Sequence, residues 1–203
     1  MPLTIGIIGF QGDVSEHAEL LKRAASKLGI EVAVVEIRKR SHLDSVQGII
    51  IPGGESTTMY KLLRLYNMYD RIRDLAKSGL PVMGTCAGLI LISSKTNDER
   101  VEGMGLIDSE VERNAYGRQI DSFMDDIEIK GIGKYKAVFI RAPVISVPGT
   151  TEVLAQYKGK PVMVKKGKVL GLTFHPELTK DTRVHEYFIK MIEGEGSTSS
   201  GNM

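Results

Sequence analysis

Reactive and metal-binding side chains are scarce in this sequence. A single cysteine, Cys86, stands among 203 residues, so the chain can form no disulfide within itself. A lone thiol fits a reducing compartment, and we expect a cytoplasmic protein. The four histidines are scattered. No group of cysteine and histidine has the spacing of zinc ligands, so we expect no metal.

Charge of one sign and long apolar runs are lacking as well. The formal net charge is only +2, which is too small to indicate a nucleic-acid or membrane surface. No apolar stretch approaches the roughly 20 residues that span a bilayer. The start, MPLTIGIIGF, lacks the charged region and long apolar core of a signal peptide. We therefore expect neither nucleic acid nor a membrane as a partner.

The first half of the sequence alternates short apolar runs with segments of helical spacing. Strands are expected over 3–10, 31–37, 48–54 and 80–85, and helices over 14–29, 57–79 (with a break near Asn67) and 87–94. This strand–helix order predicts a parallel sheet with helices on both faces.

The second half, from about residue 105, reads as strands joined by glycine-rich turns. The stretches GKP and KKGK are expected hairpin tips, and a last helix is expected over 182–194. The whole pattern predicts an α/β fold with an open, mixed, mostly parallel sheet flanked by helices. We expect residues 1–193 to form one domain and the small, polar residues 194–203 to be a disordered tail.

The single cysteine lies in the stretch GTCAG, between a predicted strand and a predicted helix. A nucleophile elbow has this pattern, with Cys86 in place of serine. Its glycines relieve clashes around a strained turn, the helix N-terminus favours a thiolate, and the N–H of Ala87 is free to bind an oxyanion. On this pentapeptide alone, an inert buried cysteine fits as well as a nucleophile.

A base for that cysteine is predicted far downstream, in the stretch TFHPEL. A cysteine nucleophile needs an imidazole, and the imidazole needs a carboxylate on its other nitrogen. Residues i and i+2 of an extended segment point to the same side, so His175 and Glu177 can meet. On its own, HPE is better explained as a surface turn with incidental polar residues. The other histidines, His17, His42 and His185, lack such a companion and are expected to be structural or solvated.

A third segment, IIIPGGEST, runs from an apolar strand into a Gly-Gly turn. Such a turn can aim a backbone amide at a ligand because no Cβ blocks the approach. Crevices at the carboxyl ends of parallel strands are where open α/β sheets bind ligands. We expect the N–H of Gly54 to be the second oxyanion donor. The same turn can also cap the following helix, with Ser56 as the N-cap.

The order and spacing of PGGES, GTCAG and HPE resemble the class I (triad) glutamine amidotransferase family, which has a flavodoxin-like fold. Within that family, ERNAYGRQIDSF (112–123) and VFIRAP (138–143) resemble the glutaminase subunits of pyridoxal 5′-phosphate synthases. The resemblance extends from IGIIGFQGDVSEH to about residue 193.

That resemblance implies a role for each matching position. Cys86 is the implied nucleophile, His175 the general base and acid, and Glu177 the residue that orients His175. The implied glutamine-binding residues are Gly54, Glu55, Ser56, Arg113, Ile140 and Arg141.

The family's reaction would proceed through a γ-glutamyl thioester on Cys86 and release glutamate and ammonia. The resemblance implies no metal and no organic cofactor. It implies a (β/α)8-barrel synthase partner that receives the ammonia for vitamin B6 synthesis, in a complex of twelve glutaminases on twelve synthase subunits. The segment around Gln11–Glu16 is the expected contact region.

Three other interpretations stay open on the sequence. The triad alone also fits glutaminase subunits of imidazole glycerol phosphate or purine synthesis. It fits a γ-glutamyl thiol hydrolase or a chaperone-like relative with the same elbow. A nucleotide-binding module is weakly suggested by GIIGFQGD, although its glycines have the wrong spacing for G-x-G-x-x-G.

Overall fold

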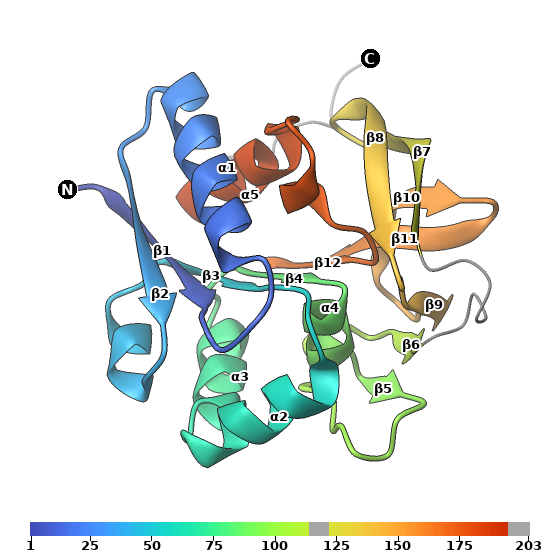
Figure 1. Ribbon diagram of the computed structural model, residues 1–203, viewed down its shortest axis with the longest axis horizontal. Helices are drawn as coiled ribbons and strands as arrows, with labels where there is room; N and C mark the ends of the chain where they lie inside the picture. The colour runs from blue at the N-terminus through green and yellow to red at the C-terminus, as the bar shows by residue number, and fades with distance from the viewer. Residues whose placement is uncertain (114–121, 195–203) are drawn as a thin grey trace.

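The computed structural model describes residues 1–113 and 122–194 (Figure 1). Within these residues, the larger sheet has the strand order β2-β1-β3-β4-β12-β11-β10-β7-β8, and a smaller sheet has the order β5-β6-β9. The strands of the larger sheet are β1 Leu3–Ile8, β2 Val32–Ile37, β3 Gly48–Ile51, β4 Val82–Thr85, β7 Ser122–Ile129, β8 Gly133–Ile140, β10 Glu152–Tyr157, β11 Lys160–Lys166 and β12 Val169–Leu172. Those of the smaller sheet are β5 Lys95–Thr96, β6 Glu110–Glu112 and β9 Val144–Val147.

The larger sheet is parallel at one end and antiparallel at the other. Strands β2, β1, β3, β4 and β12 pair in parallel, whereas β12, β11, β10, β7 and β8 pair antiparallel. The predicted open, mixed sheet is therefore confirmed. Its parallel half has the carboxyl ends of β3, β4 and β12 next to one another, and these strand ends position the candidate site.

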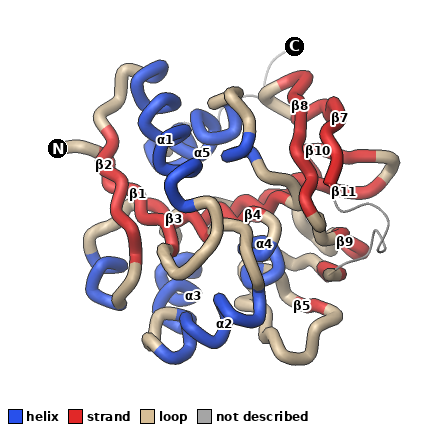
Figure 2. The backbone as a smooth tube through the Cα atoms, in the orientation of Figure 1, coloured by secondary structure: helices blue, strands red, loops and turns tan. Residues whose placement is uncertain are grey.

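Helices cover both faces of the parallel half. Helices α1 and α5 lie on one face, and α2, α3 and α4 lie on the other (Figures 1 and 2). The α-helices are α1 Val14–Leu28, α2 Ser56–Leu65, α3 Tyr69–Lys77, α4 Ala87–Ile92 and α5 Arg183–Glu193, and the 3-10 helices are η1 Arg40–Asp44 and η2 Pro176–Leu178. No helix in the described ranges is long and apolar enough to cross a membrane.

A hydrophobic core lies on each side of the sheet. Strands β3, β4 and β12 are buried along their whole length, as expected for parallel strands covered on both faces. One core includes Leu63 and Leu89 from the layer of α2 and α4, and the other includes Leu21 and Phe188 from α1 and α5. Burying each such side chain contributes about 1.5–3 kcal/mol, so this packing holds the strand ends in place.

Several local predictions are confirmed at single residues. Helix α1 ends at Gly29, which adopts the left-handed conformation. The predicted break near Asn67 separates α2 from α3, and Asn67 has a φ of 54°. The two hairpin tips fall at Lys158–Gly159 and at Gly167, all with positive φ. Residues 195–203, nearly all of the predicted tail, lie outside the described ranges.

Candidate active site

Cys86 occupies a sharp turn between β4 and α4. Its φ and ψ are 50° and −104°, a conformation that costs a non-glycine residue of order 1–3 kcal/mol. The helix that follows packs closely on β3, because a Cβ atom on Gly88 would lie 1.9 Å from the carbonyl oxygen of Ile51. The N–H of Cys86 donates to the carbonyl of Leu172 in β12 at 2.9 Å. The turn has the shape predicted for a nucleophile elbow, and Cys86 is 8% exposed.

His175 and Glu177 form a buried pair just beyond β12. His175 Nδ1 lies 2.6 Å from Glu177 Oε1, and the two residues are 5% and 4% exposed. The N–H of His175 donates to the carbonyl of Val138 in β8. The predicted pairing is present, but Glu177 lies in the 3-10 helix that starts at Pro176 rather than in an extended segment.

The ends of β3, β4 and β12 bring the cysteine and the histidine together. A Cβ atom on Gly53 would lie 2.6 Å from His175 Cε1 and 3.6 Å from Cys86 Cβ, so both side chains flank this one glycine. Strands β4 and β12 pair in parallel with Thr85 opposite Leu172. The residues that follow each strand therefore emerge at the same edge of the sheet.

The electrostatics of this cluster favour a positively charged imidazole. Burial lowers the pKa of His175, but interactions with Cys86 and Glu177 outweigh it and raise the pKa to about 10. His175 Nε2 is buried and makes no hydrogen bond of ordinary geometry with a described residue. Burial raises the pKa of Glu177, and the interaction with His175 opposes this shift. At neutral pH the imidazole of His175 is therefore positively charged, beside the sulfur.

The Gly-Gly turn lies against the loop that follows β1. A Cβ atom on Gly12 would lie 2.0 Å from the carbonyl oxygen of Gly53, so the two backbones touch. Gly54 has a φ of 133°, which favours glycine. Because the peptide is trans, the N–H of Gly54 points away from the Gly53 carbonyl oxygen and from Gly12. Gln11 ties the turn down, since its side chain bonds both the N–H and the carbonyl of Glu55 at 3.2 and 2.9 Å.

Glu55, rather than Ser56, caps helix α2. Its carboxylate accepts bonds from the N–H groups of Thr57 and Thr58 and from both hydroxyls. Burial raises the pKa of Glu55, but these hydrogen bonds outweigh it and lower the pKa to about 2. The predicted cap was therefore wrong by one residue: Ser56 is the first residue of the helix. Its Oγ is buried and has no hydrogen-bond partner among the described residues.

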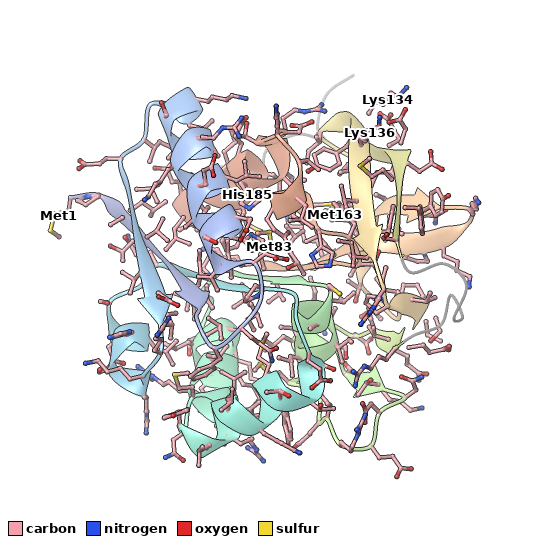
Figure 3. All side chains as sticks on the ribbon, in the orientation of Figure 1. Met1, Met83, Lys134, Lys136, Met163 and His185 are labelled. Carbon is pink, nitrogen blue, oxygen red and sulfur yellow. The ribbon has the colours of Figure 1, made fainter. Side chains whose placement is uncertain are left out.

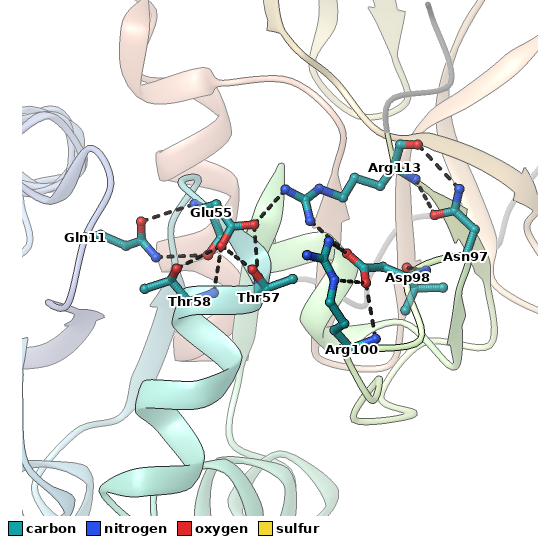
Figure 4. A network of polar contacts seen from close by, with 9 residues as sticks. Gln11, Glu55, Thr57, Thr58, Asn97, Asp98, Arg100 and Arg113 are labelled. Carbon is teal, nitrogen blue, oxygen red and sulfur yellow. Dashed lines mark hydrogen bonds and ion pairs between the residues drawn. The ribbon is translucent and has the colours of Figure 1, made fainter.

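Arg113 directly follows β6, and its side chain extends to the same turn (Figure 4). Its guanidinium group bonds Glu55 at 2.6 Å and Asp98 at 2.8 Å. Asn97 holds the Arg113 backbone, accepting from its N–H at 2.8 Å. Hydrogen bonds from Arg100, and then from Arg113, hold the pKa of Asp98 well below its usual range. The whole of the segment NAYGRQ, residues 114–119, lies outside the described ranges.

The FIRAP segment approaches the cysteine from β8. The carbonyl oxygen of Ile140 lies 3.9 Å from Cys86 Sγ. Arg141 follows with a φ of 42° and an exposed side chain. Ile140 therefore contacts the thiol through its backbone.

His17 was not predicted to belong to this site. It is fully buried, and its Nε2 atom lies 3.4 Å from Glu177 Oε2. The prediction that His17 has no carboxylate companion was wrong, because its companion comes from a distant part of the chain. The spacing of residues around His17 carries no signal that could have shown this.

Asp13 completes a group of donor atoms that could hold a cation. Within the described ranges, ligand atoms of Asp13, His175 and Glu177 all lie within 4.8 Å of one another. Asp13 Oδ2 is 3.5 Å from His175 Nδ1, the atom that already bonds Glu177. A cation at this point would compete with the His175–Glu177 pair.

A cysteine at a strand–helix turn, beside a buried histidine–glutamate pair on an open α/β sheet, is the arrangement of hydrolases that use a nucleophile elbow. The comparison with known proteins agrees. The chain belongs to the SNO glutamine amidotransferase family, which matches residues 7–194.

Individual relatives are similar over nearly the whole chain. A protein of Thermoplasma acidophilum named pyridoxal 5′-phosphate synthase subunit PdxT is 57% identical over 194 residues, covering 96% of this chain and 95% of that one. A protein of the same name from Thermotoga neapolitana is 50% identical, covering 94% of this chain and 100% of that one. A crystal structure of a glutamine amidotransferase has a TM-score of 0.83 and 44% identity, covering 93% of this chain and 98% of that one.

Proposed function

We propose that this chain hydrolyses L-glutamine to glutamate and ammonia and supplies the ammonia for pyridoxal 5′-phosphate synthesis. The observation that carries the proposal is the convergence of Cys86, His175 and Glu177 at one edge of the sheet. Membership of a glutamine amidotransferase family selects glutamine as the substrate. The relatives named as synthase subunits, 57% identical in one case, select the pathway.

The reaction begins from a thiolate–imidazolium pair. The sulfur of Cys86 attacks the side-chain carboxamide carbon of glutamine, and the carbonyl oxygen becomes an oxyanion. The N–H groups of Gly54 and Ala87 stabilise this oxyanion, and losing one such donor costs about 3 kcal/mol in barrier height. His175 gives its proton to the departing nitrogen, so the C–N bond breaks and ammonia leaves.

The second half of the reaction regenerates the enzyme. His175, now neutral, takes a proton from water, and the hydroxide attacks the γ-glutamyl thioester on Cys86. The C–S bond breaks, glutamate leaves, and the imidazolium–thiolate pair is restored. Glu177 holds His175 in the required tautomer and orientation throughout.

Binding of glutamine is assigned to the surroundings of the Gly-Gly turn. Gly54, Glu55 and Ser56 line one side of the substrate, and Ile140 and Arg141 line another. Arg113 supplies positive charge for the substrate carboxylate. Its two carboxylate partners, Glu55 and Asp98, keep the guanidinium beside the turn.

The ammonia passes to a synthase barrel subunit, and the segment around Gln11–Glu16 is the contact region. Gln11 already bonds the backbone of Glu55, so contact at this segment would act directly on the Gly-Gly turn. From the family resemblance we also propose twelve glutaminases on twelve synthase subunits, in the cytoplasm. Residues 1–193 form the amidotransferase unit.

The alternative interpretations have weaker support. Purine synthesis is represented by a chain of PurLQS from Thermotoga maritima, which shares the fold at a TM-score of 0.62 but only 17% identity. A γ-glutamyl hydrolase would use the same triad. It would cleave a γ-glutamyl peptide at least as fast as glutamine.

The test is production of ammonia and glutamate from glutamine, with and without the cognate barrel subunit. We expect turnover to rise as the barrel subunit is added, and Cys86→Ala to abolish it. The Cys86→Ala complex should still form pyridoxal 5′-phosphate when ammonium chloride replaces glutamine. Full glutaminase activity of Cys86→Ala, or faster cleavage of a γ-glutamyl peptide, would overturn the proposal.

A further inference from the structure

Two buried histidines lie directly behind Glu177, and the reaction described above uses neither. His17 lies on α1, and His185, labelled in Figure 3, lies on α5; both are 0% exposed. His17 Nδ1 is 3.0 Å from His185 Nε2. His17 Nε2 is 3.4 Å from Glu177 Oε2 and 3.4 Å from the hydroxyl of Thr85. The imidazole of His17 therefore contacts one residue from each of three elements, α5, η2 and β4.

The outer oxygen of Glu177 needs a partner. Oε1 bonds His175, whereas Oε2 is buried and makes no hydrogen bond of ordinary geometry with a described residue. An unpaired oxygen on a buried carboxylate is costly. The group that faces Oε2 is His17 Nε2, at a distance suited to an electrostatic contact rather than to a short hydrogen bond.

The tautomer of His17 follows from its two neighbours. Burial lowers the pKa of both His17 and His185, so each ring is neutral and carries one proton. A proton on His17 Nδ1 would leave the lone pair of Nε2 facing the carboxylate, which is repulsive in a dry site. A proton on Nε2 points to Glu177 Oε2 and Thr85 Oγ1, and Nδ1 then accepts the N–H of His185 Nε2.

We propose that His17 is a positioning residue for glutamine hydrolysis, holding Glu177 through Oε2 so that Oε1 stays on His175. His185 fixes the His17 tautomer by donating to Nδ1. This inference rests on the proposed function and extends it from three residues to five: Cys86, His175, Glu177, His17 and His185. The two outer histidines touch neither substrate nor sulfur.

Two substitutions separate this role from simple packing. A glutamine side chain in place of His17 can put an N–H where Nε2 lies, whereas an asparagine reaches only the Nδ1 position. We expect His17→Gln to retain kcat to within about threefold and His17→Asn to lose about 10–100-fold, with little change in KM, because a misplaced catalytic group costs up to about 100-fold. His42→Leu, at a half-buried histidine on η1, is the matched control and should leave kcat unchanged.

The dependence of kcat on pH gives a second readout. The charged or titratable groups that face His17 and Glu177 are Asp13 from the β1–α1 loop, His175 beyond β12 and His185 on α5. We expect the pH profile of His17→Asn to shift, because a displaced Glu177 no longer holds the proton on His175. Equal losses in both variants with an unshifted profile would show a purely structural role and overturn the proposal, as would no loss in either.

Nitrogen-15 NMR of the histidine rings in the unmodified protein tests the tautomer without any variant. We expect His17 to carry its proton on Nε2 and His185 also on Nε2. A proton on His17 Nδ1 would overturn the proposal even if neither variant folds. This result does not depend on turnover, so a failed glutaminase assay would reject the proposed function and not the tautomer assignment.

Discussion

At the scale of single residues, the state of His175 determines how the site starts its reaction. An imidazole with a pKa near 10 is already protonated at neutral pH, beside the cysteine. In the proposed reaction, His175 therefore acts first as an acid toward the leaving nitrogen. It acts as a base only toward the water that attacks the thioester.

Because Cys86 is one cause of the raised pKa, Cys86→Ala should lower the pKa of His175. The raised folded-state pKa stabilises the protein fully below about pH 6.5, the ordinary histidine value. That stabilisation is lost as the pH rises from 6.5 toward the value of about 10. An NMR titration of His175 in both proteins is the measurement. A midpoint near 6.5 in the unmodified protein, or the same midpoint in both, would contradict this account.

The absence of a side chain at Gly53 is also important for the position of His175. A Cβ atom there would lie 2.6 Å from His175 Cε1, so Gly53→Ala must displace the imidazole. We expect kcat to fall about 100-fold with the fold retained, as judged by circular dichroism. Gly29→Ala, at a left-handed helix cap with open space around it, is the control and should reduce stability but not kcat. Unchanged turnover in Gly53→Ala would show that His175 is less tightly held than the contact implies.

At the scale of elements, the loop between β5 and β6 supports the proposed glutamine-binding side of the site. Asp98 and Asn97 hold the side chain and the backbone of Arg113 (Figure 4). We expect Asp98→Ala to raise KM for glutamine about tenfold with a smaller effect on kcat, as expected for one lost charged hydrogen bond.

Arg100→Ala is the control for this loop. Arg100 also bonds Asp98, but the Arg100 side chain is 67% exposed and, unlike Arg113, it makes no hydrogen bond to Glu55. An ion pair this exposed to solvent contributes little, so KM should change little. Steady-state kinetics of both variants, each with the barrel subunit present, decide the matter. Equal increases in KM would mean that the loop acts as a whole rather than through Arg113.

Much of the site could be predicted from the sequence because its residues follow buried strands. Cys86 and His175 each come directly after an apolar run, and parallel strand ends meet at one edge. His17 could not be predicted, because its contact with Glu177 depends on how α1 packs over the end of the sheet. The helix cap was assigned to Ser56 because serine is a common cap, whereas the longer Glu55 side chain reaches the same N–H groups.

At the scale of the whole molecule, the parallel half of the sheet carries the chemistry and the antiparallel half contributes through β8. The parallel half, with its helices, could be predicted in outline, since the hydrophobic periodicity of the sequence changes clearly between strands and helices. The small sheet of β5, β6 and β9 was not predicted. Its strands are two to four residues long, and pairing over such distances leaves almost no pattern in the sequence.

The most direct measurement is covalent trapping with a glutamine analogue that carries an electrophile in place of the carboxamide. The folded protein, with its barrel subunit, is treated with the analogue and the modified peptide is identified by mass spectrometry. We predict one adduct per chain, located on Cys86, formed more slowly when glutamine is in excess and absent from Cys86→Ala. Modification that spares Cys86, or that proceeds at the same rate with excess glutamine, would contradict the assignment of this cysteine as the nucleophile.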